Sequence, residues 1–111
     1  MTISPAVLQP GTTLSTSAAS VITAAANTQA IVKRAVVSNP AAGAVTFTVY
    51  RVPVSGTPVA SNEIIPARSI PAGGTDLCPE LTNLVLNAGE TVQALASTGS
   101  SLNFFASGFT N

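Results

Sequence analysis

Residues 84–96 constrain the fold more than any other stretch of this chain. Apolar side chains recur there at every second position on both sides of a turn, which is the side-chain period of extended backbone. Residues 87–90 contain Asn and Gly, which tolerate the positive φ that a chain reversal needs. We therefore predict a strand, a tight turn and a second strand, paired as a hairpin. The alternating residues are Leu84 and Leu86, then Val92, Ala94 and Ala96.

A weaker copy of this turn lies upstream. Ile70–Thr75 and Leu86–Thr91 both fit the pattern apolar-x-Ala-Gly-x-Thr. A turn that occurs twice indicates a repeated corner, and this favours a sandwich over a barrel.

The rest of the chain contains short apolar or alternating segments about every 8–12 residues, separated by turn residues. No segment is a convincing helix, although the Ala-rich segment 19–24 suits one by propensity. Its β-branched residues favour a strand instead. The pattern predicts an all-β fold, an antiparallel β-sandwich or jelly roll of about seven to eight short strands with an extended N-terminal arm. The predicted strands are 19–24, 29–38, 44–52, 63–70, 75–78, 84–86, 91–96 and 102–109.

Two of these strands carry further expectations. Residues 44–52 alternate most clearly and are predicted to pair with 29–38 as a hairpin. Residues 63–70 are predicted to form an edge strand, because Pro66 cannot donate a hydrogen bond to a neighbour. The predicted core consists of Ile31, Val37, Val45, Phe47, Val49, Ile70, Leu84, Leu86, Val92, Ala94, Leu102 and Phe104.

The length of 111 residues is that of one domain. We divide it into an arm, residues 1–18, and a sandwich domain, residues 19–111. Two prolines bias the arm towards extended backbone, and it carries apolar residues at Ile3, Val7 and Leu8. We expect it to lie on another subunit, so that its deletion would leave the fold intact; the alternative is a frayed terminus.

Charged residues make up only 7% of the chain and cancel to a net charge of zero. Either the many Ser, Thr and Asn residues keep a free domain in solution, or the chain is a subunit packed against neighbours. The second is favoured, because hydroxyl and amide groups hydrogen-bond across an interface without the cost of burying ions. With only Lys33 and Arg34 adjacent, on expected exposed strand positions, no basic patch for nucleic acid is predicted.

The side chains available for chemistry are few. The chain has no histidine and one cysteine, Cys78, which is expected to be a small buried hydrophobe. Asp76 and Glu80 could share a calcium ion or act as paired carboxylates, but we expect solvated charges at a strand end. Glu90 is interpreted as a turn residue without a chemical partner. We predict no enzyme activity, catalytic residue, cofactor, metal or small-molecule substrate, and no signal peptide or membrane segment.

Four stretches together resemble a loose class of small tailed-bacteriophage virion proteins, over about residues 20–110. They are Asn27–Asn39, Val45–Arg51, Ile70–Thr75 and Leu84–Ala94. The resemblance lies in the overall pattern and includes no single diagnostic motif. It implies a β-sandwich or jelly-roll subunit of the particle without catalysis, either a capsid decoration (cement) protein or a tail- or fibre-associated protein.

From this resemblance we favour a decoration protein that stabilises the head shell through protein–protein contacts. Its expected partners are other virion proteins, above all the major capsid protein, and further copies of itself. The expected location is the virion, after assembly in the host cytoplasm. A tail or fibre subunit, or a carbohydrate-binding or adhesion module, stays open as an alternative. The candidate contact residues lie in the arm and in the loop 53–62: Ile3, Val7, Leu8, Val54, Pro58 and Val59.

Overall fold

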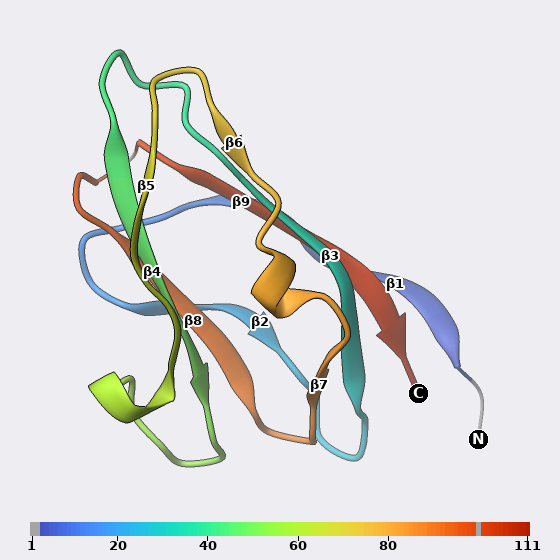
Figure 1. Ribbon diagram of the computed structural model, residues 1–111. Coiled ribbons are helices and arrows are strands. Elements are labelled where there is room, and N and C mark those ends of the chain that lie inside the picture. Colours follow the sequence, from blue (N-terminus) through green and yellow to red (C-terminus); the bar gives the residue numbers. More distant parts are fainter. Residues whose placement is uncertain (1–2, 100) are drawn as a thin grey trace.

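The computed structural model describes residues 3–99 and 101–111, which contain nine strands in two antiparallel sheets (Figure 1). Met1 and Thr2 of the predicted arm lie outside the described residues. The larger sheet contains β1 (Ser4–Thr13), β9 (Asn103–Thr110), β3 (Ala30–Ser38), β6 (Thr75–Asp76) and β7 (Leu84–Leu86). The smaller sheet contains β2 (Ala19–Thr23), β8 (Thr91–Ala96), β4 (Val45–Val52) and β5 (Glu63–Ile70). The predicted all-β sandwich is confirmed.

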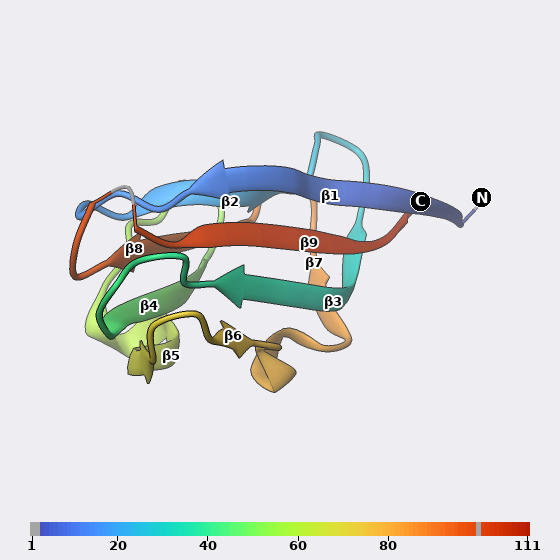
Figure 2. The same ribbon diagram turned by 90° about the horizontal axis from the view of Figure 1, so that it is seen from above.

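The strand pairs are nested along the chain, which defines the topology. β4 pairs with β5, β3 with β6 and β7, β2 with β8, and β1 with β9. A chain paired in this way is one long hairpin. Rolling it into two layers places β9 between β1 and β3, and β8 between β2 and β4 (Figure 2). This arrangement is a jelly roll, in which β6 and β7 share one strand position beside β3.

Both copies of the repeated turn cross from one sheet to the other. Ile70–Thr75 leads from β5 to β6, and Leu86–Thr91 leads from β7 to β8. Gly73 and Gly89 adopt positive φ of 72° and 84° there. The predicted corners are therefore confirmed. The predicted hairpin of β7 with β8 is wrong, because β7 pairs with β3 and the turn backbone is bonded to Ala24 instead.

The predicted hairpin of β3 with β4 is also wrong, since the two strands lie in different sheets. Asn39 directs this crossing from a nearly fully buried position. Its amide nitrogen lies 3.0 Å from the carbonyl oxygen of Gly43 and 2.8 Å from that of Ile70. The loop after β3 is thereby bound to the corner after β5. β5 is an edge strand, as Pro66 predicted.

The segment predicted as an arm is mostly strand β1, which pairs with β9 from Ser4 to Thr13. The backbone is extended, as predicted, but it lies on the sandwich of its own chain. Two leucines explain this placement, because Leu14 is buried and Leu8 packs against the core. The Gln9 side chain also donates a hydrogen bond of 2.8 Å to the carbonyl of Val21 in β2.

Ten of the twelve predicted core residues are buried, and the two exceptions are Ile31 and Leu84. Val32 is buried in place of Ile31, because a β-bulge between Val32 and Arg34 shifts the alternation of β3 by one residue. The helices of the described residues are two three-residue 3₁₀ turns, η1 (Ala60–Asn62) and η2 (Pro79–Leu81), and neither is long enough to cross a membrane.

Candidate interaction surface

The six predicted contact residues fall into two separate groups. Ile3 and Val7 are 60% and 70% exposed, and Val54 and Val59 are 57% and 47% exposed. Leu8 and Pro58 are only half-exposed, and Leu8 faces the core. Figure 1 shows the loop 53–62 at the lower left and the start of β1 at the lower right. The structure therefore does not bring the two groups into one patch.

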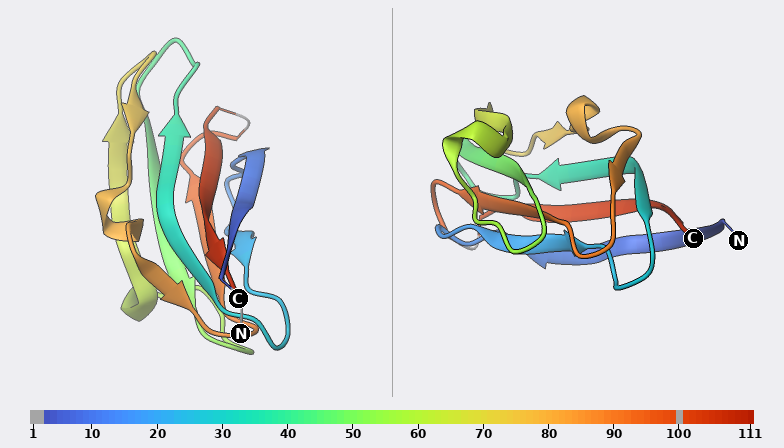
Figure 3. Two further views of the ribbon diagram at one scale, coloured as in Figure 1. Left: turned by 90° about the vertical axis from the view of Figure 1, so that its right-hand side faces the viewer. Right: turned by 90° about the horizontal axis from the view of Figure 1, so that it is seen from below.

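A larger apolar surface lies on the outer face, by which we mean the side of β1, β9, β3 and β7 turned away from the smaller sheet. Figure 3 shows β9 between β1 and β3 in both of its views. Directly paired residues of antiparallel strands place their side chains on the same face. One row of apolar residues crosses four strands in register and consists of Pro5, Phe109, Ile31 and Val85.

A second apolar group lies further along β9. Phe105 pairs with Val36 of β3, and its side chain is 41% exposed. On its other side the ring lies over Gly11 of β1, where an added Cβ would stand only 2.8 Å from a ring carbon. The outer face is therefore apolar at both ends, although this side of the sheet does not face the core.

Register shifts interrupt the pairing on both sides of β9, in the middle of the outer face. On β1 they fall between Val7 and Gln9 and between Gln9 and Thr12, and on β3 a single bulge falls between Val32 and Arg34. Lys33 is the extra residue of the β3 bulge, so that Lys33 and Arg34 are both exposed instead of alternating between faces. Bulges of this kind redirect side chains and are frequent beside functional sites.

Gly108 allows β9 to approach the β3 bulge closely. A Cβ at this position would stand 1.9 Å from the carbonyl oxygen of Ile31 and 3.0 Å from the amide nitrogen of Lys33. Both neighbours are backbone atoms, which cannot move aside as a flexible side chain could. The shape of the outer face at this point therefore requires glycine.

Two adjoining grooves lie along this part of the outer face. The first, of about 480 Å³, is lined by Pro5, Ala6, Val7, Lys33, Ser107, Gly108 and Phe109. The second, of about 270 Å³, is lined by Val7, Gln9, Pro10, Arg34, Val36, Phe105, Ala106 and Ser107. Val7 and Ser107 border both grooves. Each groove thus has an apolar side on β1 and one basic residue on β3.

Within the part of the chain that the structure describes, no carboxylate forms an ion pair with the basic residues of the outer face. Arg51 and Arg68 form all the ion pairs found within the described residues. Lys33 instead donates a hydrogen bond of 2.7 Å to the side-chain oxygen of Asn83. The outer face therefore carries two positive charges within an apolar surround.

Glu90 has a partner, which corrects the interpretation made from sequence. One of its carboxylate oxygens accepts hydrogen bonds from the Arg51 guanidinium at 2.8 Å and from the backbone amide of Asn87 at 2.7 Å. The pair joins β4 to the corner between β7 and β8, so Glu90 stabilises the crossing.

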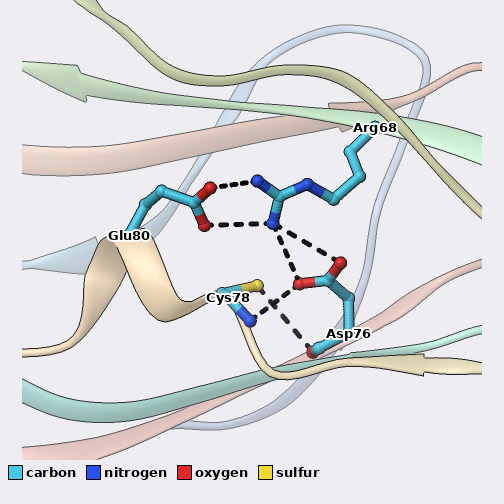
Figure 4. A network of polar contacts seen from close by, with 4 residues as sticks. All are labelled: Arg68, Asp76, Cys78 and Glu80. Atoms are coloured by element: carbon cyan, nitrogen blue, oxygen red, sulfur yellow. Dashed lines mark hydrogen bonds and ion pairs between the residues drawn. The ribbon is translucent and has the colours of Figure 1, made fainter.

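Asp76 and Glu80 also bind an arginine (Figure 4). Arg68 forms ion pairs with both, and the distance to Asp76 is 3.3 Å. The hydrogen bond from Arg68 lowers the pKa of Glu80 below its ordinary value. The described residues contain no group of three or more acidic, cysteine or histidine side chains that could hold a metal. The two carboxylates are thus structural ion-pair partners rather than simple solvated charges.

Cys78 lies beside this network and is buried, as predicted. Burial raises the pKa of its thiol to about 12, and the nearby Asp76 carboxylate acts in the same direction. A thiol with so high a pKa is not a nucleophile near neutral pH.

The outer face could not be identified from sequence because both faces of β3 are apolar, which is also typical of a strand covered on both sides. The adjacent pair Lys33-Arg34 was the one signal of a break in alternation. Among the aromatic residues, Phe104 is buried as predicted, whereas Phe105 is exposed.

No protein-family model matches the chain, and no curated protein matches it by sequence. Solved structures do match its fold over 98% of its length. One is a chain in the structure of infectious bursal disease virus Gx strain, with a TM-score of 0.52 and 16% identity. Another is a chain in the crystal structure of the T13 viral particle of the same virus, with a TM-score of 0.53 and 14% identity. The match covers 31% and 30% of those chains, so this chain spans less than a third of their length.

Proposed function

We propose that this chain is a structural subunit of a virus particle. The observation that carries the proposal is the jelly roll formed by nearly the whole chain, which resembles part of two chains from particles of infectious bursal disease virus. Jelly rolls occur in viral capsid proteins and also in lectins and cupins. The low charge and the scarcity of catalytic side chains favour a structural role among these.

Within this role we propose a capsid decoration protein of a tailed bacteriophage, as the sequence resemblance implies. Four of the predicted contact residues are exposed and apolar, which supports contacts with other virion proteins. They lie in two groups, Ile3 with Val7 and Val54 with Val59. Burial of such side chains contributes about 25 cal/mol per Å² before the cost of association, so several contacts per subunit stabilise a shell.

Copy number tests this proposal and separates it from a tail or fibre subunit. Quantitative mass spectrometry of purified particles of the virus that encodes this chain is expected to find hundreds of copies per particle. A few copies per particle would instead assign it to the tail or a fibre. Absence of the chain from washed particles would refute a virion role.

A carbohydrate-binding module receives less support from the structure. The two aromatic residues of the outer face, Phe105 and Phe109, are four residues apart on one strand, or about 13 Å. Ser107 lies between them, so the two rings do not form one stacking platform for a sugar. Binding of the isolated domain on a glycan array would contradict this argument.

A further inference from the structure

We propose that the outer face is a docking site for a protein segment that carries both apolar and acidic side chains. The inference deepens the proposed function by defining the chemistry of the partner, and it rests on that function only for the expectation that the partner is a virion protein. The site consists of the two grooves and their borders on β1, β9 and β3.

The charge of the face selects an acidic partner. Lys33 and Arg34 are exposed, and neither takes part in an ion pair within the residues that the structure describes. Covering them with a neutral apolar surface would remove water from two charges without compensation. A partner that supplies carboxylates would replace that water and add charge-assisted hydrogen bonds.

The same charges disfavour a second copy of this chain as the occupant. In a symmetric dimer each face meets an identical face, so Lys33 and Arg34 at the centre would oppose their own counterparts. Three of the four acids are already bound, Glu90 to Arg51 and both Asp76 and Glu80 to Arg68. The fourth, Glu63, lies at the start of β5 in the smaller sheet, so it is not part of the outer face. The occupant is therefore a different protein.

The apolar lining favours a protein over nucleic acid. Val7 borders both grooves. Pro5 and Phe109 add apolar surface to the first groove, and Val36 and Phe105 add it to the second. A phosphate backbone would gain nothing from these side chains, whereas a peptide can place an apolar side chain in each groove. The two basic residues follow one another along β3, one at each groove. The partner is therefore expected to combine apolar side chains for the grooves with carboxylates towards β3.

Site-specific cross-linking in cells that produce the virus tests the site and the partner together. A photo-reactive residue, p-benzoylphenylalanine, replaces Val7 in one variant and Val59 in a matched control, both exposed positions with apolar side chains. The cross-linked peptide is identified by mass spectrometry. We expect position 7 to label a peptide of another protein that contains Asp or Glu, and position 59 not to label that peptide.

Charge variants supply the second measurement. Lys33→Glu combined with Arg34→Glu is expected to reduce the position-7 cross-link at least tenfold, while Lys33→Arg with Arg34→Lys preserves it. Both residues are exposed, so neither double variant is expected to unfold the chain. Circular dichroism and thermal unfolding check this, and a charge variant that does not fold is replaced by Lys33→Gln with Arg34→Gln.

The outcomes separate this inference from the proposed function. A cross-link to an acidic segment of a protein outside the virion, with the chain absent from particles, supports the docking site and refutes the virion role. A chain present on particles but cross-linked from position 7 to its own copies, to nucleic acid or to nothing overturns the docking site alone. An undiminished cross-link in the folded charge-reversal variant also overturns it.

Discussion

Gly108 is the residue on which the shape of the outer face most directly depends. Its missing side chain lets β9 lie against the β3 bulge, and that bulge presents Lys33 and Arg34 together. The close backbone approach and the two adjacent exposed charges thus lie at one local irregularity of β3. Single residues of this kind decide where a surface differs from the regular alternation of a strand.

Gly108→Ala is expected to destabilise the protein by about 1–3 kcal/mol or more, because the new methyl group collides with backbone atoms of β3. Gly43→Ala is the matched control, since no heavy atom lies within 4 Å of a Cβ there. Its effect is expected to stay within about 0.5 kcal/mol. Urea unfolding measures both variants, and equal stabilities would contradict the close approach of β9 and β3.

The Cys78 thiol is expected to resist alkylation in the folded protein at pH 8. Burial raises its pKa to about 12, so almost no reactive thiolate is present at that pH. Labelling with iodoacetamide is expected to require unfolding in urea. Rapid labelling of the native protein would show that Cys78 is accessible to solvent, and this would contradict its buried position.

At the scale of elements, the sequence predicted where strands lie better than which strands pair. Residues 44–52 and 63–70 alternate or end at turn residues, and both are strands close to the predicted bounds. Pairing depends on contacts between distant residues, such as the bonds of the Asn39 amide to the corner after β5. Such contacts leave no periodic signal, so β3 and β4 looked like a hairpin.

The β3 bulge illustrates the same limit for the candidate site. A one-residue shift exchanges the faces of a strand, so Ile31 was predicted in the core and lies on the outer face instead. Leu8 was likewise predicted to contact a partner, but it packs against the core of its own chain. Val7, its neighbour, does border the grooves.

Deleting residues 1–18 is expected to destabilise the fold, contrary to the expectation for a detached arm. The deletion removes β1, exposes the edge of β9 and takes Leu14 out of the core. Loss of one buried leucine side chain alone costs about 2–5 kcal/mol. A variant lacking only residues 1–3, which precede β1, serves as the control, and equal urea midpoints for the two deletions would refute the role of β1.

The ion pair between Arg68 and Glu80 is expected to make stability depend on pH. The folded protein holds the pKa of Glu80 below 4.5, its ordinary value. Glu80 therefore stabilises the fold above about pH 4.5, and this contribution is lost as the pH falls through the folded pKa.

Glu80→Gln measures this contribution. The variant is expected to be less stable than the wild type at pH 6, by less than about 1 kcal/mol because the pair is partly exposed. The difference should shrink towards pH 3. Glu63→Gln, at an exposed position outside the ion pairs of the described residues, is the control. A difference that does not change with pH would contradict the assignment.

At the scale of the whole molecule, the nested pairing brings the two ends of the chain together. Ser4 pairs with Thr110, at one end of the outer face (Figure 1). The outer face thus combines the first strand, the last strand, β3 and β7. Strands far apart in the sequence must pair before this face exists, so binding through it reports that the larger sheet has formed.

A density map of the whole particle tests the central claim of a virion subunit most directly. Particles of the virus that encodes this chain would be imaged, and the jelly roll fitted into density outside the shell. We expect copies at equivalent positions on the head, with β1, β9 and β3 turned towards a neighbouring protein. A complete map of the particle, head and tail, without density for this jelly roll would contradict the account.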